Sequence, residues 1–104
     1  MTTVTLIHSE DKLTGFMCKG HAGFARAGKD IVCAAVSVLS TTCANALESV
    51  AGVTPEIEVD DGYMKVALPD GCDSHDAHVI LRTFEQGVRD IKASYPKYIH
   101  ITTR

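Results

Sequence analysis

The sequence predicts an α+β fold: a single two-layer domain with one mixed sheet, two helices on one face, and the element order β-β-α-β-β-α-β. Three observations lead to this prediction. Short stretches alternate apolar with polar residues, two longer stretches carry apolar residues at helical spacing, and 104 residues have room for one modest core. We therefore expect residues 1–104 to form one domain without a linker.

The first half of the chain is expected to form a hairpin and a helix. In "TVTLIH", Val4 and Leu6 alternate with threonines, the polar run 9–12 follows, and a second extended stretch covers 13–20. The stretch 31–51 is small or apolar on nearly all sides, which predicts a largely buried helix. Asp30 is placed to cap the start of this helix and Gly52 to end it.

The second half is expected to repeat this order and to add a strand. A hairpin over 55–68 turns at Asp61 and Gly62, which suit a tight turn. Ser74 or Asp73 caps a second helix, which Pro96 stops before a last strand over 98–103. The residues expected to face the core are Ile57, Val59, Met64, Val66 and Leu68 from the hairpin, and Ala77, Leu81, Phe84, Val88, Ile91 and Tyr95 from the helix.

Composition and charge exclude several classes of function. The net charge is −3 and Lys and Arg do not cluster, so direct binding to nucleic acid is not expected. The first residues lack a signal-peptide pattern and no run of about eighteen apolar residues occurs, so we expect a cytoplasmic protein that does not enter a membrane. The four cysteines form no C-x-x-C pair, so we expect reduced thiols.

The stretch "GHAGFARAGKDIVCAAVS" places His21 and Cys33 where they can meet. Cys33 is expected in the first turn of the helix, where unpaired N–H groups and the helix dipole favour a thiolate. The pair then supports nucleophilic catalysis: the sulfur attacks a carbonyl, the N–H groups receive the oxyanion, and the histidine protonates the leaving amine. By spacing alone, a core cysteine and a surface histidine are the commoner outcome.

Neighbouring residues have supporting roles in this hypothesis. Asp30 orients the histidine or caps the helix; one side chain rarely does both, and capping is favoured. Ser37, one helical turn after the cysteine, touches the dyad or bonds the carbonyl four residues back. Gly23 and Gly28 give the segment before the helix the freedom to act as a mobile cover over the site.

The remaining cysteines and histidines have weaker claims to function. "CDSHDAH" offers Cys72, His75 and His78 at three-residue steps as metal ligands. A fourth ligand is missing nearby and helix capping explains the polar residues, so no metal is expected. Structural roles are expected for the others: Cys18, Cys43, His8 and His100.

The stretch from 20 to 37 resembles the signature of the ribosomal-processing cysteine protease family (Prp). That pattern runs Gly-His, a short gap, Gly-x-Asp-x-x-Cys, and a serine four residues later. The chain length, the order of elements and the closing "YPKYIHI" are similar to the family as well. The matching residues are Gly20, His21, Gly28, Asp30, Cys33 and Ser37.

The resemblance implies a function. Members of that family are small bacterial homodimeric endopeptidases that remove a short N-terminal extension from a large-subunit ribosomal protein, cutting after an aromatic residue. The same activity is implied here, with His21 and Cys33 as the dyad, no cofactor, and a homodimer. The alternative is a non-enzymatic, ribosome-associated dimeric binding module, in which the same helix start captures an anion or a peptide terminus.

Overall fold

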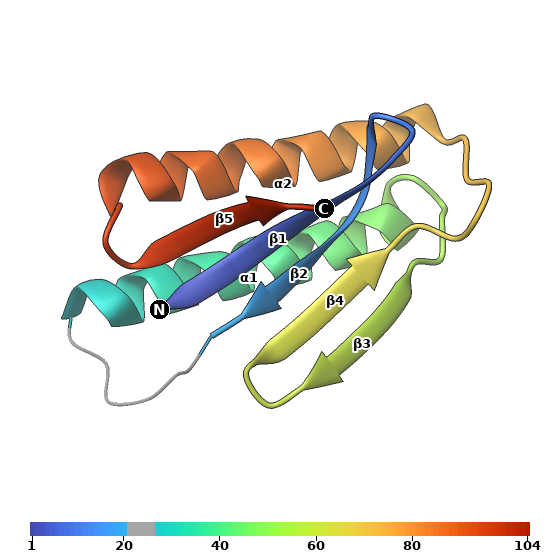
Figure 1. Ribbon diagram of the computed structural model, residues 1–104. Helices are drawn as coiled ribbons and strands as arrows, with labels where there is room; N and C mark the ends of the chain where they lie inside the picture. The colour runs from blue at the N-terminus through green and yellow to red at the C-terminus, as the bar shows by residue number, and fades with distance from the viewer. Residues whose placement is uncertain (21–26) are drawn as a thin grey trace.

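The computed structural model describes residues 1–20 and 27–104, with side chains for 1–20 and 31–104, and it has the expected α+β fold (Figure 1). One sheet has the strand order β3-β4-β2-β1-β5; β1 and β5 are parallel, and the other neighbours are antiparallel. Both helices lie on the same face of the sheet. The elements are β1 (Thr2–Ser9), β2 (Lys12–Lys19), α1 (Ala27–Ser49), β3 (Glu56–Asp60), β4 (Tyr63–Ala67), α2 (His75–Ser94) and β5 (Ile99–Thr103).

The core lies between the sheet and the two helices. Alternate residues of the central strands point into it, so that Val4, Leu6 and Phe16 are fully buried. Phe16 of β2 stacks on Phe84 of α2, with ring centroids 3.9 Å apart and 18° between the ring planes. Because burial of one such side chain contributes about 1.5–3 kcal/mol, this pair is a main attachment of α2 to the sheet.

The two hairpin turns follow the predicted polar stretches. Glu10 and Asp11 close the first turn with φ angles of 51° and 67°. Positive φ at both central residues gives the turn a twist that matches the flanking strands. The second turn contains Gly62, whose φ of 67° is in the left-handed region that favours glycine.

The prediction that Ile57 and Val59 of β3 pack into the core is wrong, although both point to the predicted face of the sheet. Ile57 and Val59 pair with Val66 and Met64 of β4 and share their face of the sheet. Even so, Ile57 is 47% exposed and Val59 is 71% exposed, whereas Val66 and Leu68 are buried. The reason is position: β3 is the edge strand of the described sheet, and the helices do not extend over it (Figure 1).

Helix α1 begins earlier than the sequence predicts. It runs from Ala27 instead of Ile31, so Asp30 is the fourth helical residue and not the N-cap. The predicted end is confirmed within two residues. Gly52 has a φ of 69°, and its N–H donates to the Glu48 carbonyl at 3.0 Å, which ends the helix as a left-handed glycine does.

Helix α1 is also less buried than predicted. Its inner side carries Val32 and Leu47, both fully buried, but Ile31 is 51% exposed and Val38 is 67% exposed on the outer side. No other described element covers this outer side, because the fold has only two layers there. By length and mean hydropathy (1.5), residues Ile31–Ser49 are also apolar enough to cross a membrane, a test that core helices of soluble proteins pass as well.

Helix α2 matches its prediction closely. Ser74 is the N-cap, and its Oγ accepts a hydrogen bond from the Ala77 N–H at 3.1 Å. The helix ends at Ser94, before Pro96. Lys92 donates to the Ile99 carbonyl at 2.8 Å and so ties the end of the helix to β5. The buried stripe of the helix consists of Ala77, Leu81, Phe84 and Val88, with Ile91 and Tyr95 partly buried.

Candidate active site

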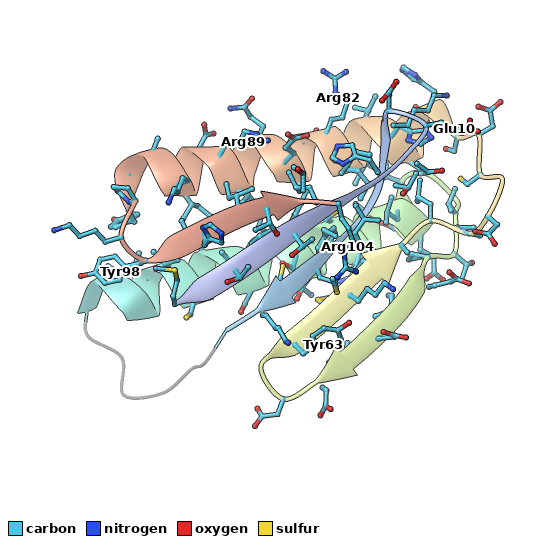
Figure 2. All side chains as sticks on the ribbon, in the orientation of Figure 1. Glu10, Tyr63, Arg82, Arg89, Tyr98 and Arg104 are labelled. Atoms are coloured by element: carbon cyan, nitrogen blue, oxygen red, sulfur yellow. The ribbon has the colours of Figure 1, made fainter. Side chains whose placement is uncertain are left out.

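A cavity of about 270 Å³ lies where β1, β2, α1 and β4 meet, and Cys33 lines it. Cys33 is half-buried, and its Sγ lies 3.4 Å from Thr2 Oγ1 at the start of β1. Ser37 lines the same cavity one turn further along α1, so two of the predicted site residues, Cys33 and Ser37, lie at one cavity. The other lining residues include Thr2, Cys18, Gly20, Val36, Ser40, Thr41, Tyr63 and Met64; Figure 2 shows Tyr63 at the beginning of β4.

Cys33 does not lie in the first helical turn, which corrects the sequence prediction. Because α1 starts at Ala27, Cys33 is its seventh residue and belongs to the second turn. The unpaired N–H groups of a helix are those of its first four residues, and the effect of the dipole falls off within one turn. The helix start therefore favours a thiolate at Cys33 less than the sequence indicated.

Gly20, the residue after β2, lines the same cavity and lies close to Thr2 of β1. A Cβ at Gly20 would be 2.9 Å from Thr2 Oγ1 and 3.1 Å from Thr2 Cα, so any other residue there would have to displace Thr2. The Gly20 N–H donates to the Gly62 carbonyl at 3.0 Å and fixes this strand end on the second hairpin. Thr2 thus contacts both Gly20, which precedes His21 in the chain, and Cys33.

Several predicted site residues fall outside these contacts. His21 and Gly23 lie outside the described residues. Gly28 lies in the first turn of α1 and not in a segment before the helix, so the predicted mobile cover does not reach that far. Asp30 lies in the same turn.

The four cysteines, all within the described residues, are reduced thiols that differ in environment. Burial raises the pKa of the Cys18 thiol to about 11, although a contact with Ser40 Oγ at 3.2 Å lowers it in part. Burial, with a smaller effect of Cys18, raises the pKa of Cys43 to about 12. Both are therefore neutral thiols near pH 7, as expected of structural cysteines. Cys72 is half-buried, like Cys33, but does not line the cavity.

Sequence reasoning missed Thr2, although the signal for it was present. Val4 and Leu6 are the apolar residues of the alternating pattern, and strand residues two apart share a face, so Thr2 belongs to the same side. Its burial is 96%, since only 4% is exposed. What the sequence does not contain is the distance from this strand to α1, because that depends on how the helix packs.

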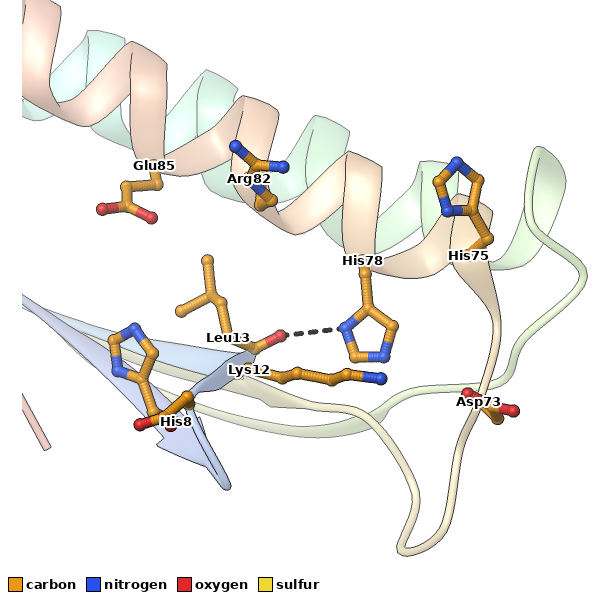
Figure 3. Close-up of a pocket in the computed structure, with 9 residues that line it drawn as sticks. His8, Lys12, Leu13, Asp73, His75, His78, Arg82 and Glu85 are labelled. Atoms are coloured by element: carbon orange, nitrogen blue, oxygen red, sulfur yellow. Dashed lines mark hydrogen bonds between the residues drawn. The ribbon is translucent and has the colours of Figure 1, made fainter.

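A second cavity of about 460 Å³ lies at the other end of the molecule, between α2 and the β1–β2 turn (Figure 3). His75 and His78 line it, but Cys72 does not. His78 Nδ1 lies 3.2 Å from the Leu13 carbonyl oxygen, while Nε2 is buried without a hydrogen-bond partner among the described atoms. Within the described residues no three His, Cys, Asp or Glu side chains gather as metal ligands.

A reduced cysteine that lines a cavity between a sheet and a helix is an arrangement suited to a cysteine peptidase. The chain belongs to the family described as "Cysteine protease Prp", whose sequence profile matches residues 1–100. It is therefore a cysteine peptidase, and the alternative of a non-enzymatic binding module is not supported.

Full-length relatives agree with this membership. The chain is 29% identical to the ribosomal processing cysteine protease Prp of Bacillus subtilis (strain 168), over 99% of this chain and 97% of the relative. It is 30% identical to the protein of the same name from Staphylococcus aureus (strain Mu50), over 97% of each.

Solved structures of the S. aureus protease have the same fold. The structure in complex with a substrate peptide superposes over 100% of both chains with a TM-score of 0.91 and 27% identity. The structure in complex with a covalently linked product peptide gives a TM-score of 0.87 and 28% identity over 100% of both chains.

Proposed function

We propose that this protein is an endopeptidase that removes a short N-terminal extension from a large-subunit ribosomal protein, with Cys33 as nucleophile and His21 as general acid and base. One observation carries the proposal. Cys33 is partly exposed and lines a cavity, and Gly20, the residue before His21, lines the same cavity. The relatives named above are ribosomal processing proteases, which supports this class of substrate.

The proposed reaction proceeds through a covalent intermediate. Cys33 Sγ attacks the scissile carbonyl carbon as a thiolate, and the carbonyl oxygen becomes an oxyanion. His21 then gives its proton to the leaving amine, and the peptide bond breaks to leave a thioester on Cys33. Water, deprotonated by His21, attacks the thioester and releases the new carboxyl end together with the free thiol. The covalently linked product peptide in the S. aureus relative supports such an intermediate.

The cavity beside Cys33 has the size and lining for an aromatic side chain of the substrate. A cavity of about 150 Å³ already admits benzene, and this one is about 270 Å³. Val36 and Met64 give it apolar walls. We therefore assign to it the aromatic residue before the scissile bond, which the family resemblance implies.

A homodimer in the bacterial cytoplasm is part of the proposal. The outer side of α1 exposes Ile31 and Val38 two helical turns apart, and a second copy packed there would remove both from water. Val38→Lys is expected to convert the dimer to a monomer in sedimentation equilibrium. A wild-type protein that sediments as a monomer at micromolar concentration would contradict the dimer.

The experiment that tests the function uses a synthetic peptide that spans the extension of the organism's own ribosomal protein. Wild type is expected to cleave it once, after an aromatic residue, and to form a thioester adduct that mass spectrometry maps to Cys33. Cys33→Ala is expected to lose cleavage, and Cys72→Ala, the matched control with a half-buried thiol outside the cavity, to retain it. Cleavage by Cys33→Ala at the wild-type rate would contradict the proposal.

A further inference from the structure

The side chain of Thr2 is held rigidly beside the candidate nucleophile. It is 96% buried, and its Oγ1 lies 3.4 Å from Cys33 Sγ. The backbone of Thr2 is fixed on one side by its N–H, which donates to the Tyr98 carbonyl at 3.2 Å, and by its pairing with β5. On the other side the close approach of Gly20 leaves the Thr2 side chain little room to move.

The direction of this hydrogen bond depends on the protonation state of the sulfur. In the neutral pair either atom can donate. A thiolate has no proton, so in the reactive state Thr2 Oγ1–H must donate and Cys33 Sγ must accept. Hydrogen bonds to a charged acceptor are roughly twice as strong as those between neutral groups, and they favour the charged form. The contact therefore strengthens when Cys33 ionises.

From this geometry we infer that Thr2 is a positioning residue of the active site: its hydroxyl stabilises the Cys33 thiolate and holds the sulfur toward the cavity. The inference rests on the proposed role of Cys33 as nucleophile. A thiolate is stabilised by a hydrogen-bond donor. The start of α1 does not offer one from its unpaired N–H groups, because Cys33 lies in the second turn, beyond them. The donor comes from β1 instead.

The test measures the second-order rate of Cys33 alkylation by iodoacetamide between pH 5 and 10, with peptide mapping to separate Cys33 from the other thiols. Thr2→Val removes the hydroxyl and keeps the branched shape. We expect its curve to move toward higher pH and its rate near neutral pH to fall several-fold, because the thiolate loses a hydrogen-bond donor. Thr2→Ser, which keeps the hydroxyl, is expected to stay near the wild-type curve.

The matched control is Thr5→Val, on the same strand. Thr5 Oγ1 hydrogen-bonds Thr102 Oγ1 at 2.9 Å, so this variant also loses a threonine hydrogen bond between β1 and a neighbouring element, but away from Cys33. Its alkylation curve is expected to match that of wild type. If Thr2→Val does not fold, the pair Thr2→Ser and Thr2→Ala makes the same comparison, since both lose the methyl group and only one loses the hydroxyl.

The outcomes separate this inference from the proposed function. Superimposable curves for wild type and Thr2→Val, with cleavage still dependent on Cys33, would overturn the role of Thr2 and leave the protease assignment intact. A lower melting temperature without a shifted midpoint would show that Thr2 only packs, and would overturn the role equally. Wild-type cleavage by Cys33→Ala would instead overturn the nucleophile assignment on which both depend.

Discussion

Gly20 lies so close to Thr2 that a side chain at position 20 would collide with it: a Cβ there would lie 2.9 Å from Thr2 Oγ1. The Gly-His dipeptide of the sequence signature therefore has a structural explanation for its first member. Glycine lets the end of β2 approach β1 closely, at the point where Thr2 contacts Cys33. The backbone that leads to His21 is thus placed at the edge of the cavity.

Replacement of Gly20 by alanine is expected to disturb the site more than the fold. The new Cβ must push Thr2 away by a few tenths of an ångström, and overpacking of this kind costs about 1–3 kcal/mol. Misplacement near reacting groups is expected to lower kcat/KM about tenfold or more. Peptide cleavage is measured well below the melting temperature of the variant.

Gly15→Ala is the matched control for this prediction. A Cβ at Gly15 would lie 2.5 Å from the Val66 carbonyl oxygen, so this variant strains the same strand β2 without touching the cavity. Equal losses of activity in the two variants at equal folded fraction would show that Gly20 serves only the stability of the sheet.

The stacked rings of Phe16 and Phe84 lead to a prediction about stability. Phe84→Ala removes one fully desolvated ring and leaves a cavity against its partner, which is expected to lower the free energy of unfolding by about 3–5 kcal/mol. Val79→Ala, one of the exposed positions on the same helix, is expected to change it by less than about 0.5 kcal/mol. Urea denaturation measures both, and similar losses would contradict the central place of the stack.

Much of the fold can be predicted from local pattern, and β3 shows where this stops. Alternation places Ile57 on the correct face of its strand, but burial requires something to cover that face, and at this edge of the sheet the helices do not. In contrast, Val66 on the neighbouring strand has the same alternation and is covered. The alternation of a strand indicates the face to which each side chain points, whereas the burial of that face depends on where the helices lie.

The candidate active site shows a similar division. The motif indicated Cys33 and Ser37, and the structure gathers them at one cavity. The start of α1 was misplaced by four residues, since Asp30 is a good N-cap residue and the preceding Ala-Gly-Lys carries no apolar periodicity. Thr2 is 31 residues from Cys33 in the chain, and contacts at such separation follow from tertiary packing alone.

The buried thiols predict how stability depends on pH. Burial raises the pKa of Cys18 from 9.0 to about 11, so the folded state holds its proton more tightly than the unfolded state. The contribution of this thiol is complete below pH 9 and is lost as pH rises toward 11. We expect the urea midpoint to fall more steeply over this range in wild type than in Cys18→Ala, because the variant lacks this titration. Identical slopes for the two proteins would contradict the prediction.

The last prediction concerns the coupling of His21 to Cys33. Attack needs the sulfur as a thiolate, while expulsion of the amine needs a proton on the histidine, and each charge stabilises the other. We therefore expect a bell-shaped pH profile of kcat/KM whose two limbs belong to the pair of residues. His21→Ala is expected to slow peptide cleavage and also alkylation of Cys33 near neutral pH.

A double-mutant cycle of His21→Ala and Thr2→Val tests whether the two residues act on the Cys33 thiolate separately. His21 acts on the thiolate by charge and Thr2 by a hydrogen bond from β1, so each single variant should slow alkylation near neutral pH and the double variant should be slower than either. Thr5→Val in the His21→Ala background is the control and should add nothing. Alkylation curves of wild type and His21→Ala that superimpose from acid to alkaline pH would mean that His21 does not meet Cys33, and the general base would then have to be another residue.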